Sequence, residues 1–264
     1  MLQTLVMTSV PDYLIDRFAP TCRPEGRCVM RNVWQHLTFL HWAVPVEQLR
    51  PLIPRELEID VFEGKAYIGL VPFTMRGVRP LWLPTLPLAA GLYENFHETN
   101  VRTYVHFRGG EPGVWFFSLD ASNLPAVATA RAWYKLPYFF ARMSLQRRLS
   151  RSGTTIEYSS RRYAPQHKAH SFLACKPLGP AAPAAPGTLE HFLAERYILY
   201  SRAGRTLYRG RVHHAPYPLQ RAEVLSLDES LLSAAGIMRP NEAPLAHYAR
   251  EVSVEIFPLE AVNG

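Results

Sequence analysis

Residues 98–105, with the sequence ETNVRTYV, carry polar side chains at every second position. If this segment is a strand, alternation places one set on the same face: Glu98, Asn100, Arg102 and Tyr104. An arginine can bind a carboxylate through two parallel hydrogen bonds, and a glutamate beside it can transfer protons. The segment therefore indicates either the lining of a cavity that binds an organic acid or, if it is a sheet edge, a row facing solvent.

Residues 131–143, RAWYKLPYFFARM, form a second candidate, because Lys135 stands there among aromatic side chains. On a helix, Arg131 and Lys135 would share one face. Repulsion between the two cations would lower the pKa of the lysine if water is excluded, and such a lysine can form a Schiff base. The alternative is an ammonium group that reaches water at a helix end and satisfies terminal carbonyl groups.

Histidines and cysteines lack the spacing of a metal site. His167 and His170 are three residues apart with Cys175 beyond them, and His213 and His214 are neighbours in an expected strand. Neighbouring strand residues point to opposite faces, so only one histidine of this pair can line a given cavity. No phosphate-binding loop or nucleophile elbow is present. The sequence predicts no metal and no cofactor.

The bulk composition describes a folded chain with a large core. Of 264 residues, 48% are hydrophobic, and the net charge is +7 with only four lysines. The arginines are scattered and no nucleic-acid-binding signature accompanies them, so we expect no nucleic-acid partner. Three cysteines suit a reducing compartment, and no apolar run is long enough to span a membrane. We expect a cytoplasmic protein without a membrane association.

The elements expected from periodicity and turn residues are mainly strands. We predict strands and hairpins over 57–75, 100–121, 141–163, 197–214 and 250–260, with helices over 44–54, 123–136, 188–197 and 226–236. Ser226 is the expected N-cap of the last helix, and a Pro/Ala loop is expected over 177–187. The pattern predicts an α+β fold around an antiparallel sheet, with residues 1–264 as a single domain and 1–30 as an N-terminal extension packed on it.

Several segments together resemble a known family: WQHLTFLHWAVPVEQLRPLIPRELEID, ETNVRTYV, GVWFFSLDA, LPYFFARM, FLAERYILY and HHAPYPLQRAEV. On these residues the chain is identified as a member of the YqjF-like uncharacterised bacterial proteins, domain of unknown function 2071. That family is similar, more distantly, to acetoacetate decarboxylase. The resemblance implies a closed antiparallel β cone or barrel with a few peripheral helices, an internal ligand cavity and self-association into homo-oligomers.

The resemblance changes what is expected of both candidate segments. Matching proline to proline puts Tyr138 and Phe139 where the decarboxylase has its paired lysines, so Lys135 is left without a lysine neighbour and Schiff-base chemistry is in doubt. An enclosed fold favours the cavity for the alternating face of residues 98–104. Glu98 and Lys135 are the catalytic candidates, and the predicted substrate-binding residues are Asn100, Arg102, Tyr104, Arg131, Tyr138, Arg142, Arg196 and His213.

The expected function is binding of a small anionic molecule such as an oxo acid. If the protein is an enzyme, cofactor-independent lyase or hydrolase chemistry with Glu98 as the proton-transfer group is the expected scheme. The alternative is a noncatalytic ligand-binding or sensor protein on the same scaffold. For the arginines in apolar surroundings, a structural ion pair with Asp60, Asp120 or Glu195 is an open alternative.

Overall fold

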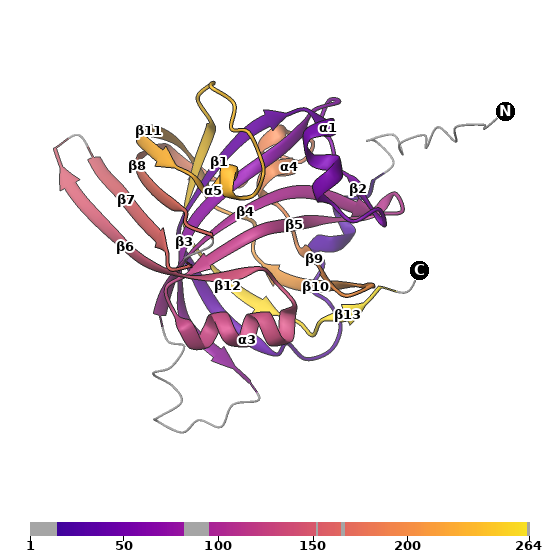
Figure 1. The fold of residues 1–264 in the computed structure, drawn as a ribbon. Coiled ribbons are helices and arrows are strands. Elements are labelled where there is room, and N and C mark those ends of the chain that lie inside the picture. The colour runs from indigo at the N-terminus through magenta and orange to yellow at the C-terminus, as the bar shows by residue number, and fades with distance from the viewer. Residues whose placement is uncertain (1–14, 82–94, 152, 165–166, 263–264) are drawn as a thin grey trace.

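The computed structural model describes residues 15–81, 95–151, 153–164 and 167–262 (Figure 1). The strands are β1 (Met30–Val44), β2 (Leu57–Ile59), β3 (Ala66–Pro80), β4 (Asn95–Phe107), β5 (Gly110–Ala121), β6 (Tyr138–Ser150), β7 (Gly153–Arg162), β8 (His170–Ala182), β9 (Ile198–Ala203), β10 (Thr206–His214), β11 (Leu219–Glu229), β12 (Leu245–Ile256) and β13 (Glu260–Ala261). The α-helices are α1 (Val46–Leu49), α3 (Leu124–Tyr134), α4 (Leu189–Ala194) and α5 (Leu231–Ala234). Two 3-10 helices, η2 (Ala19–Thr21) and η3 (Arg50–Leu52), complete the described elements.

All thirteen described strands belong to one sheet, and part of it closes on itself. The pairings run β1–β3–β4–β5–β9–β10–β12 and return from β12 to β1, so these strands form a ring. Most pairs are antiparallel, whereas β5 is parallel to both β6 and β9. The predicted α+β fold, mainly antiparallel and closed, with few helices, is confirmed as this ring of strands with short helices around it.

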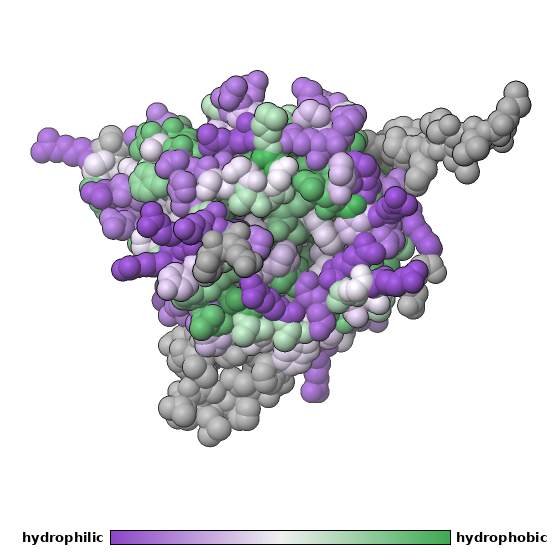
Figure 2. Space-filling model, viewed as in Figure 1, coloured by the Kyte–Doolittle hydropathy of each residue, from purple (hydrophilic) through white to green (hydrophobic). Residues whose placement is uncertain are grey.

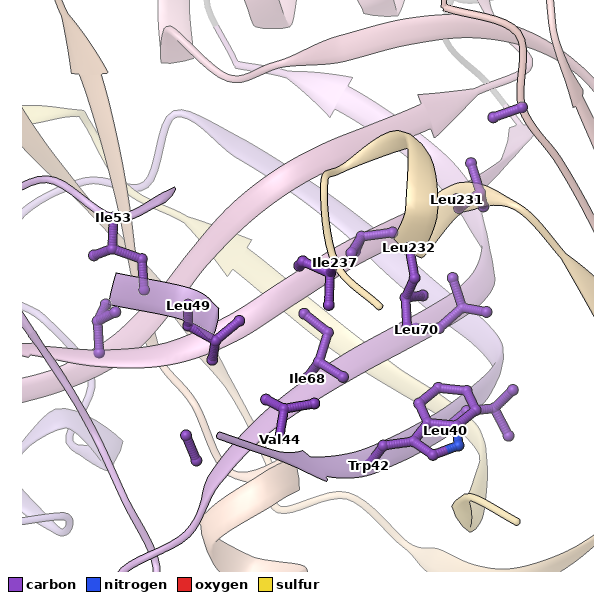
Figure 3. Close-up of a cluster of buried hydrophobic side chains, with 14 of the residues drawn as sticks. Leu40, Trp42, Val44, Leu49, Ile53, Ile68, Leu70, Leu231, Leu232 and Ile237 are labelled. Atoms are coloured by element: carbon purple, nitrogen blue, oxygen red, sulfur yellow. The ribbon is translucent and has the colours of Figure 1, made fainter. Parts of the chain in front are cut away.

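The two faces of the ring strands have different partners. On β1 and β3, one alternating set packs with the short helices α1 and α5 into a buried apolar cluster (Figure 3). The labelled members of that cluster are Leu40, Trp42, Val44, Leu49, Ile53, Ile68, Leu70, Leu231, Leu232 and Ile237. The opposite set, including Phe39 and Val71, points into the ring. This division explains why these strands read as nearly continuous apolar runs.

Most expected elements are present, but two segments are different from the prediction. The helix predicted over 226–236 is wrong in its first half, because β11 continues to Glu229 through pairing with β8 and α5 begins only after Ser230. The loop predicted over 177–187 is wrong in its first residues, since β8 continues to Ala182. In both places a neighbouring strand supplies hydrogen bonds that override the local turn and capping signals.

Gly113 on β5 lies where two backbones approach closely. A Cβ atom built on this glycine would be 2.6 Å from the backbone oxygen of Ile198 on β9. Gly113→Ala is therefore expected to lower the free energy of unfolding by about 2–3 kcal/mol, because the backbone cannot move aside as a flexible side chain can. Gly110→Ala on the same strand is the matched control, since its added Cβ would have 3.9 Å of clearance from the nearest atom. Urea unfolding of both variants tests this, and equal losses would contradict it.

Candidate functional site

The inner faces of the ring strands enclose a cavity of about 150 Å³. Helix α3 lies beside the ring (Figure 1) and contributes Ala126, Thr129, Ala130 and Tyr134 to the wall. Much of the rest of the lining is apolar, with residues such as Phe73, Phe96 and Leu119. A dry apolar cavity of roughly this volume is large enough for a ligand the size of benzene.

Strand β4 supplies the polar part of this lining through Glu98, Asn100 and Arg102. All three side chains are buried. The Arg102 guanidinium donates from Nη2 to the carbonyl oxygen of Leu193 at 3.1 Å, while its Nε and the Asn100 Oδ1 atom have no hydrogen-bond partner among the described residues. A buried polar atom without a partner is costly, so this pair is suited to a ligand that satisfies both.

Tyr104, the fourth residue of the predicted row, is buried deeper than the cavity. Its hydroxyl donates to the Leu193 carbonyl oxygen at 2.8 Å and lies 2.7 Å from His41 Nε2. Tyr104 does not line this cavity, so the structure does not place this predicted binding residue together with Glu98, Asn100 and Arg102 at the wall. Because Arg102 and Tyr104 donate to the same carbonyl oxygen, Tyr104 helps to fix the position of the Arg102 side chain.

Glu98 and Tyr138 are joined by a hydrogen bond at the cavity wall. The Tyr138 hydroxyl donates to Glu98 Oε2 at 2.8 Å. Burial raises the pKa of Glu98 to about 8; the Tyr138 hydrogen bond opposes this rise and the charge of Asp120 adds to it. Burial also raises the pKa of Tyr138 well above its usual value, so the phenol keeps its proton. At neutral pH, Glu98 is therefore a neutral carboxylic acid that can donate a proton.

Arg196 lines the same cavity but is also held by a buried ion pair. Its Nη1 atom is 2.6 Å from Asp60 Oδ2, and Arg17 donates to both oxygens of the same carboxylate at 2.6 and 2.8 Å. The Arg196 Nη2 atom has no hydrogen-bond partner among the described residues. Ion pairing with Asp60 thus anchors a guanidinium at the cavity wall.

Besides Tyr104, four predicted site residues lie outside this cavity. Lys135 is the C-cap of α3 with a φ of 55°, and its ammonium donates to the Ala132 carbonyl oxygen, as the alternative interpretation of this lysine predicts. Arg131 is exposed and donates to the Tyr138 carbonyl oxygen, Arg142 is exposed on β6, and His213 is on the opposite face of β10 from Val212, which lines the cavity. Strand alternation and the end of α3 turn these four side chains away from the ring interior.

Sequence reasoning missed His214, Trp34, Asn32 and Tyr217 on the inner side of the ring. Val212, two residues before His214, lines the cavity, so alternation selects His214 as the inward member of the histidine pair. The same two-residue spacing places Asn32 on the face of β1 that carries Met30 and Trp34, which both line the cavity. An apolar residue two positions away was the available signal in both cases.

The described part of the chain has neither of two common features, a metal-binding cluster and a membrane-spanning helix. No group of three histidine, cysteine, aspartate or glutamate residues there is arranged to hold a metal ion. No described helix is long and apolar enough to cross a membrane. On the face shown in Figure 2, hydrophilic side chains predominate around the rim and apolar ones appear in patches between them.

Comparison with solved structures identifies the fold. The enduracididine biosynthesis enzyme MppR complexed with pyruvate matches with a TM-score of 0.62 at 10% identity, covering 92% of each chain. Acetoacetate decarboxylase from Legionella pneumophila matches with the same TM-score at 10% identity, covering 99% of this chain and 98% of the other. An acetoacetate decarboxylase-like enzyme from Sphingomonas wittichii RW1 also has a TM-score of 0.62, at 11% identity over 90% of this chain and 94% of the other. The fold is therefore acetoacetate decarboxylase-like.

Sequence comparison identifies the family. The family model of domain of unknown function 2071, described as an uncharacterized conserved protein, matches residues 31–253. The uncharacterized protein YqjF of Bacillus subtilis strain 168 is 38% identical over 236 residues, which are 89% of this chain and 93% of the relative. The chain belongs to the family of uncharacterized conserved proteins known as domain of unknown function 2071, on an acetoacetate decarboxylase-like fold.

Proposed function

We propose that this protein binds a small organic monoanion of the oxo-acid type inside the ring of strands. Arg102 donates to the carboxylate through Nε, the apolar wall holds the carbon chain, and Glu98 exchanges a proton with the bound molecule. The observation that carries this proposal is the buried Arg102 guanidinium, whose Nε atom is unpartnered among the described residues, in the same cavity as the Glu98 carboxyl group, whose pKa is raised to about 8.

The charges around the cavity favour an anion. Asp60 is shared by Arg17 and Arg196, so this group of three keeps one net positive charge. Glu98 adds no negative charge at pH 7, because its pKa is raised to about 8. Arg102 is then a cation in an apolar enclosure, where its interaction with a carboxylate is screened less than at the surface.

Proteins with this fold give the proposal its substrate class. MppR has been solved with pyruvate and with the condensation product of pyruvate and imidazole 4-carboxaldehyde. Acetoacetate decarboxylases carry an oxo acid in their name. Since the described cavity contains no lysine in its lining, we propose cofactor-independent lyase or hydrolase chemistry in which Glu98 acts as general acid and base.

Binding and turnover of candidate acids test the proposal. Pyruvate, 2-oxobutanoate and acetoacetate are titrated into the full chain by calorimetry, and their conversion is followed by proton NMR. Saturable binding together with product formation supports the enzyme. Binding without conversion of any acid supports the noncatalytic ligand-binding alternative, and no binding of any acid overturns the proposal.

The pH dependence of binding depends on Glu98. The anion is expected to bind best while Glu98 is protonated, so its affinity should be constant up to about pH 7 and fall up to tenfold for each pH unit above about 8. Glu98→Gln keeps a neutral group and should bind with the same affinity from pH 6 to 9. The control Glu251→Gln, exposed on the outer face of β12, should keep the wild-type profile. An unchanged alkaline fall in Glu98→Gln would show that another group titrates.

A further inference from the structure

A second set of polar side chains without partners lies on the inner side of the ring, on β1 and β10. Both polar atoms of the Asn32 side chain, Nε1 of Trp34 and Nε2 of His214 are buried without a hydrogen bond among the described residues. Asn32 is only 4% exposed and His214 only 3%. Buried polar atoms of native proteins nearly always bond to protein, water or ligand, so these atoms need a partner.

The strand register brings these three side chains to one inner surface. Asn32 is paired with Val254 on β12, and Val254 is paired with His214 on β10. Asn32, Val254 and His214 therefore project from the same face of adjacent strands. Trp34 follows Asn32 on that face, and its ring is centred 6.0 Å from the His214 ring. Trp34 itself lines the cavity.

The chemistry of this set is uncharged. His214 Nδ1 is 2.8 Å from the carbonyl oxygen of Ala215, which assigns the proton to Nδ1 and leaves Nε2 as an acceptor. Burial lowers the pKa of His214 to about 4, so the ring is neutral at physiological pH. Trp34 Nε1 is a donor, and the Asn32 amide can both donate and accept. A hydroxyl group can donate to His214 Nε2 and accept from Trp34 Nε1 and from the Asn32 amide nitrogen.

Trp34 and Tyr217 connect this surface to the cavity around Arg102, because both line that cavity, whereas Asn32 and His214 line a neighbouring pocket. The His214 ring lies between Tyr197 and Tyr217, with ring centroids 4.5 and 4.4 Å away, and Tyr217 lines the cavity. The Tyr217 ring is centred 5.2 Å from the Phe39 ring, and the guanidinium carbon of Arg102 lies 5.6 Å from the centre of the same Phe39 ring. A ligand that extends from Arg102 past Phe39 and Tyr217 would reach His214.

We propose that Asn32, Trp34 and His214 form a polar subsite for the far end of the ligand, so that the preferred substrates are organic acids carrying a hydroxyl group at the end opposite the carboxylate. Arg102 holds the carboxylate, and the subsite recognises the hydroxyl through His214 Nε2, Trp34 Nε1 and the Asn32 amide nitrogen. This inference rests on the proposed function, because it assumes that the carboxylate lies at Arg102.

Matched pairs of acids test the subsite. The probes are 4-hydroxybutanoate, 5-hydroxypentanoate and 6-hydroxyhexanoate, each compared by calorimetry with the unsubstituted acid of the same chain length. At least one hydroxy acid should bind about 10- to 100-fold more tightly than its partner, because a hydroxyl satisfies buried polar atoms that an alkyl chain leaves unpaired. Equal affinity within every pair would overturn the subsite.

Two variants assign the preference to these residues. His214→Phe keeps a ring between Tyr197 and Tyr217 but removes the acceptor, and Asn32→Leu removes the amide at similar volume. Each should reduce the preference for the hydroxy acid at least about fivefold, in line with the loss of one hydrogen bond to a buried group. Gln35→Leu is the control and should keep the full preference, because Gln35 is on the opposite face of β1, where its amide donates to Glu251.

The outcomes separate this inference from the proposed function. Binding of all the acids with equal affinity within each pair, and loss of that binding in Arg102→Met, would overturn the subsite while supporting the anion site. A preference that survives unchanged in both folded variants would also overturn the subsite. Failure of both the hydroxy and the unsubstituted acids to bind would contradict the anion site, and the subsite inference would fall with it.

Discussion

Arg102→Met is expected to weaken the binding of an oxo-acid anion about 100-fold or more. Truncation of one partner of a buried, hydrogen-bonded charge pair typically costs about 2–5 kcal/mol, and about 3 kcal/mol corresponds to a factor of more than 100 in Kd. Methionine retains much of the apolar stem of arginine but offers no donor to a carboxylate. Calorimetric titration of pyruvate into both proteins measures the change.

The same substitution should leave the fold nearly as stable as before. The Leu193 carbonyl oxygen loses the Arg102 donor but keeps the Tyr104 hydroxyl, so it remains hydrogen-bonded. We expect the free energy of unfolding to change by about 1 kcal/mol or less, because removal of a buried charge offsets the lost hydrogen bond. A large loss of affinity at nearly constant stability would separate ligand binding from structural support.

Arg142→Met provides the matched control for this experiment. Arg142 lies on β6 and is exposed, so its replacement removes the same charge from the chain without touching the cavity. The net charge of both variants falls equally, and any effect of overall charge on association appears in both. If Arg102→Met bound the acid as tightly as Arg142→Met, Arg102 would have no part in carboxylate recognition.

Asp60→Asn is expected to lower the free energy of unfolding by about 3–5 kcal/mol, the range for breaking a buried ion pair from one side. The Asp60 side chain is fully buried and accepts from both Arg17 and Arg196. Burial alone would raise the pKa of Asp60, but the two guanidinium groups hold it below its usual value, so the group is ionised at neutral pH. An asparagine leaves the buried Arg196 charge without a counter-ion.

Glu255→Gln tests whether the stability loss expected for Asp60→Asn comes from burial of the carboxylate or from the number of arginines paired with it. Glu255 also accepts from two arginines, Arg23 and Arg31, but this cluster is partly exposed on the outer face of β12. Water and salt screen such pairs, so the loss should be below about 1 kcal/mol. Urea unfolding of both variants at the same pH compares them directly. Similar losses would show that the enclosed position of Asp60 contributes nothing to its effect.

The sequence by itself determined most of the local structure. The alternation over residues 98–104 correctly places its polar side chains on one face, and the glycines at 64, 109 and 204 mark turns between strands that the structure contains. These features depend on side-chain direction and backbone conformation within a few residues, which the sequence encodes directly. The family was also recognisable from short segments, and the match over residues 31–253 confirms it.

Only the tertiary structure decided which polar groups face the cavity and which are already satisfied. Tyr104 shares a face with Arg102, yet distant His41 and Leu193 occupy its hydroxyl. His214 instead of His213 turns inward because of the way β10 pairs with β12. Lys135 satisfies a carbonyl of its own helix and never reaches the ring interior. Hydrogen-bond partners and enclosure come from residues far apart in the chain, so local patterns cannot specify them.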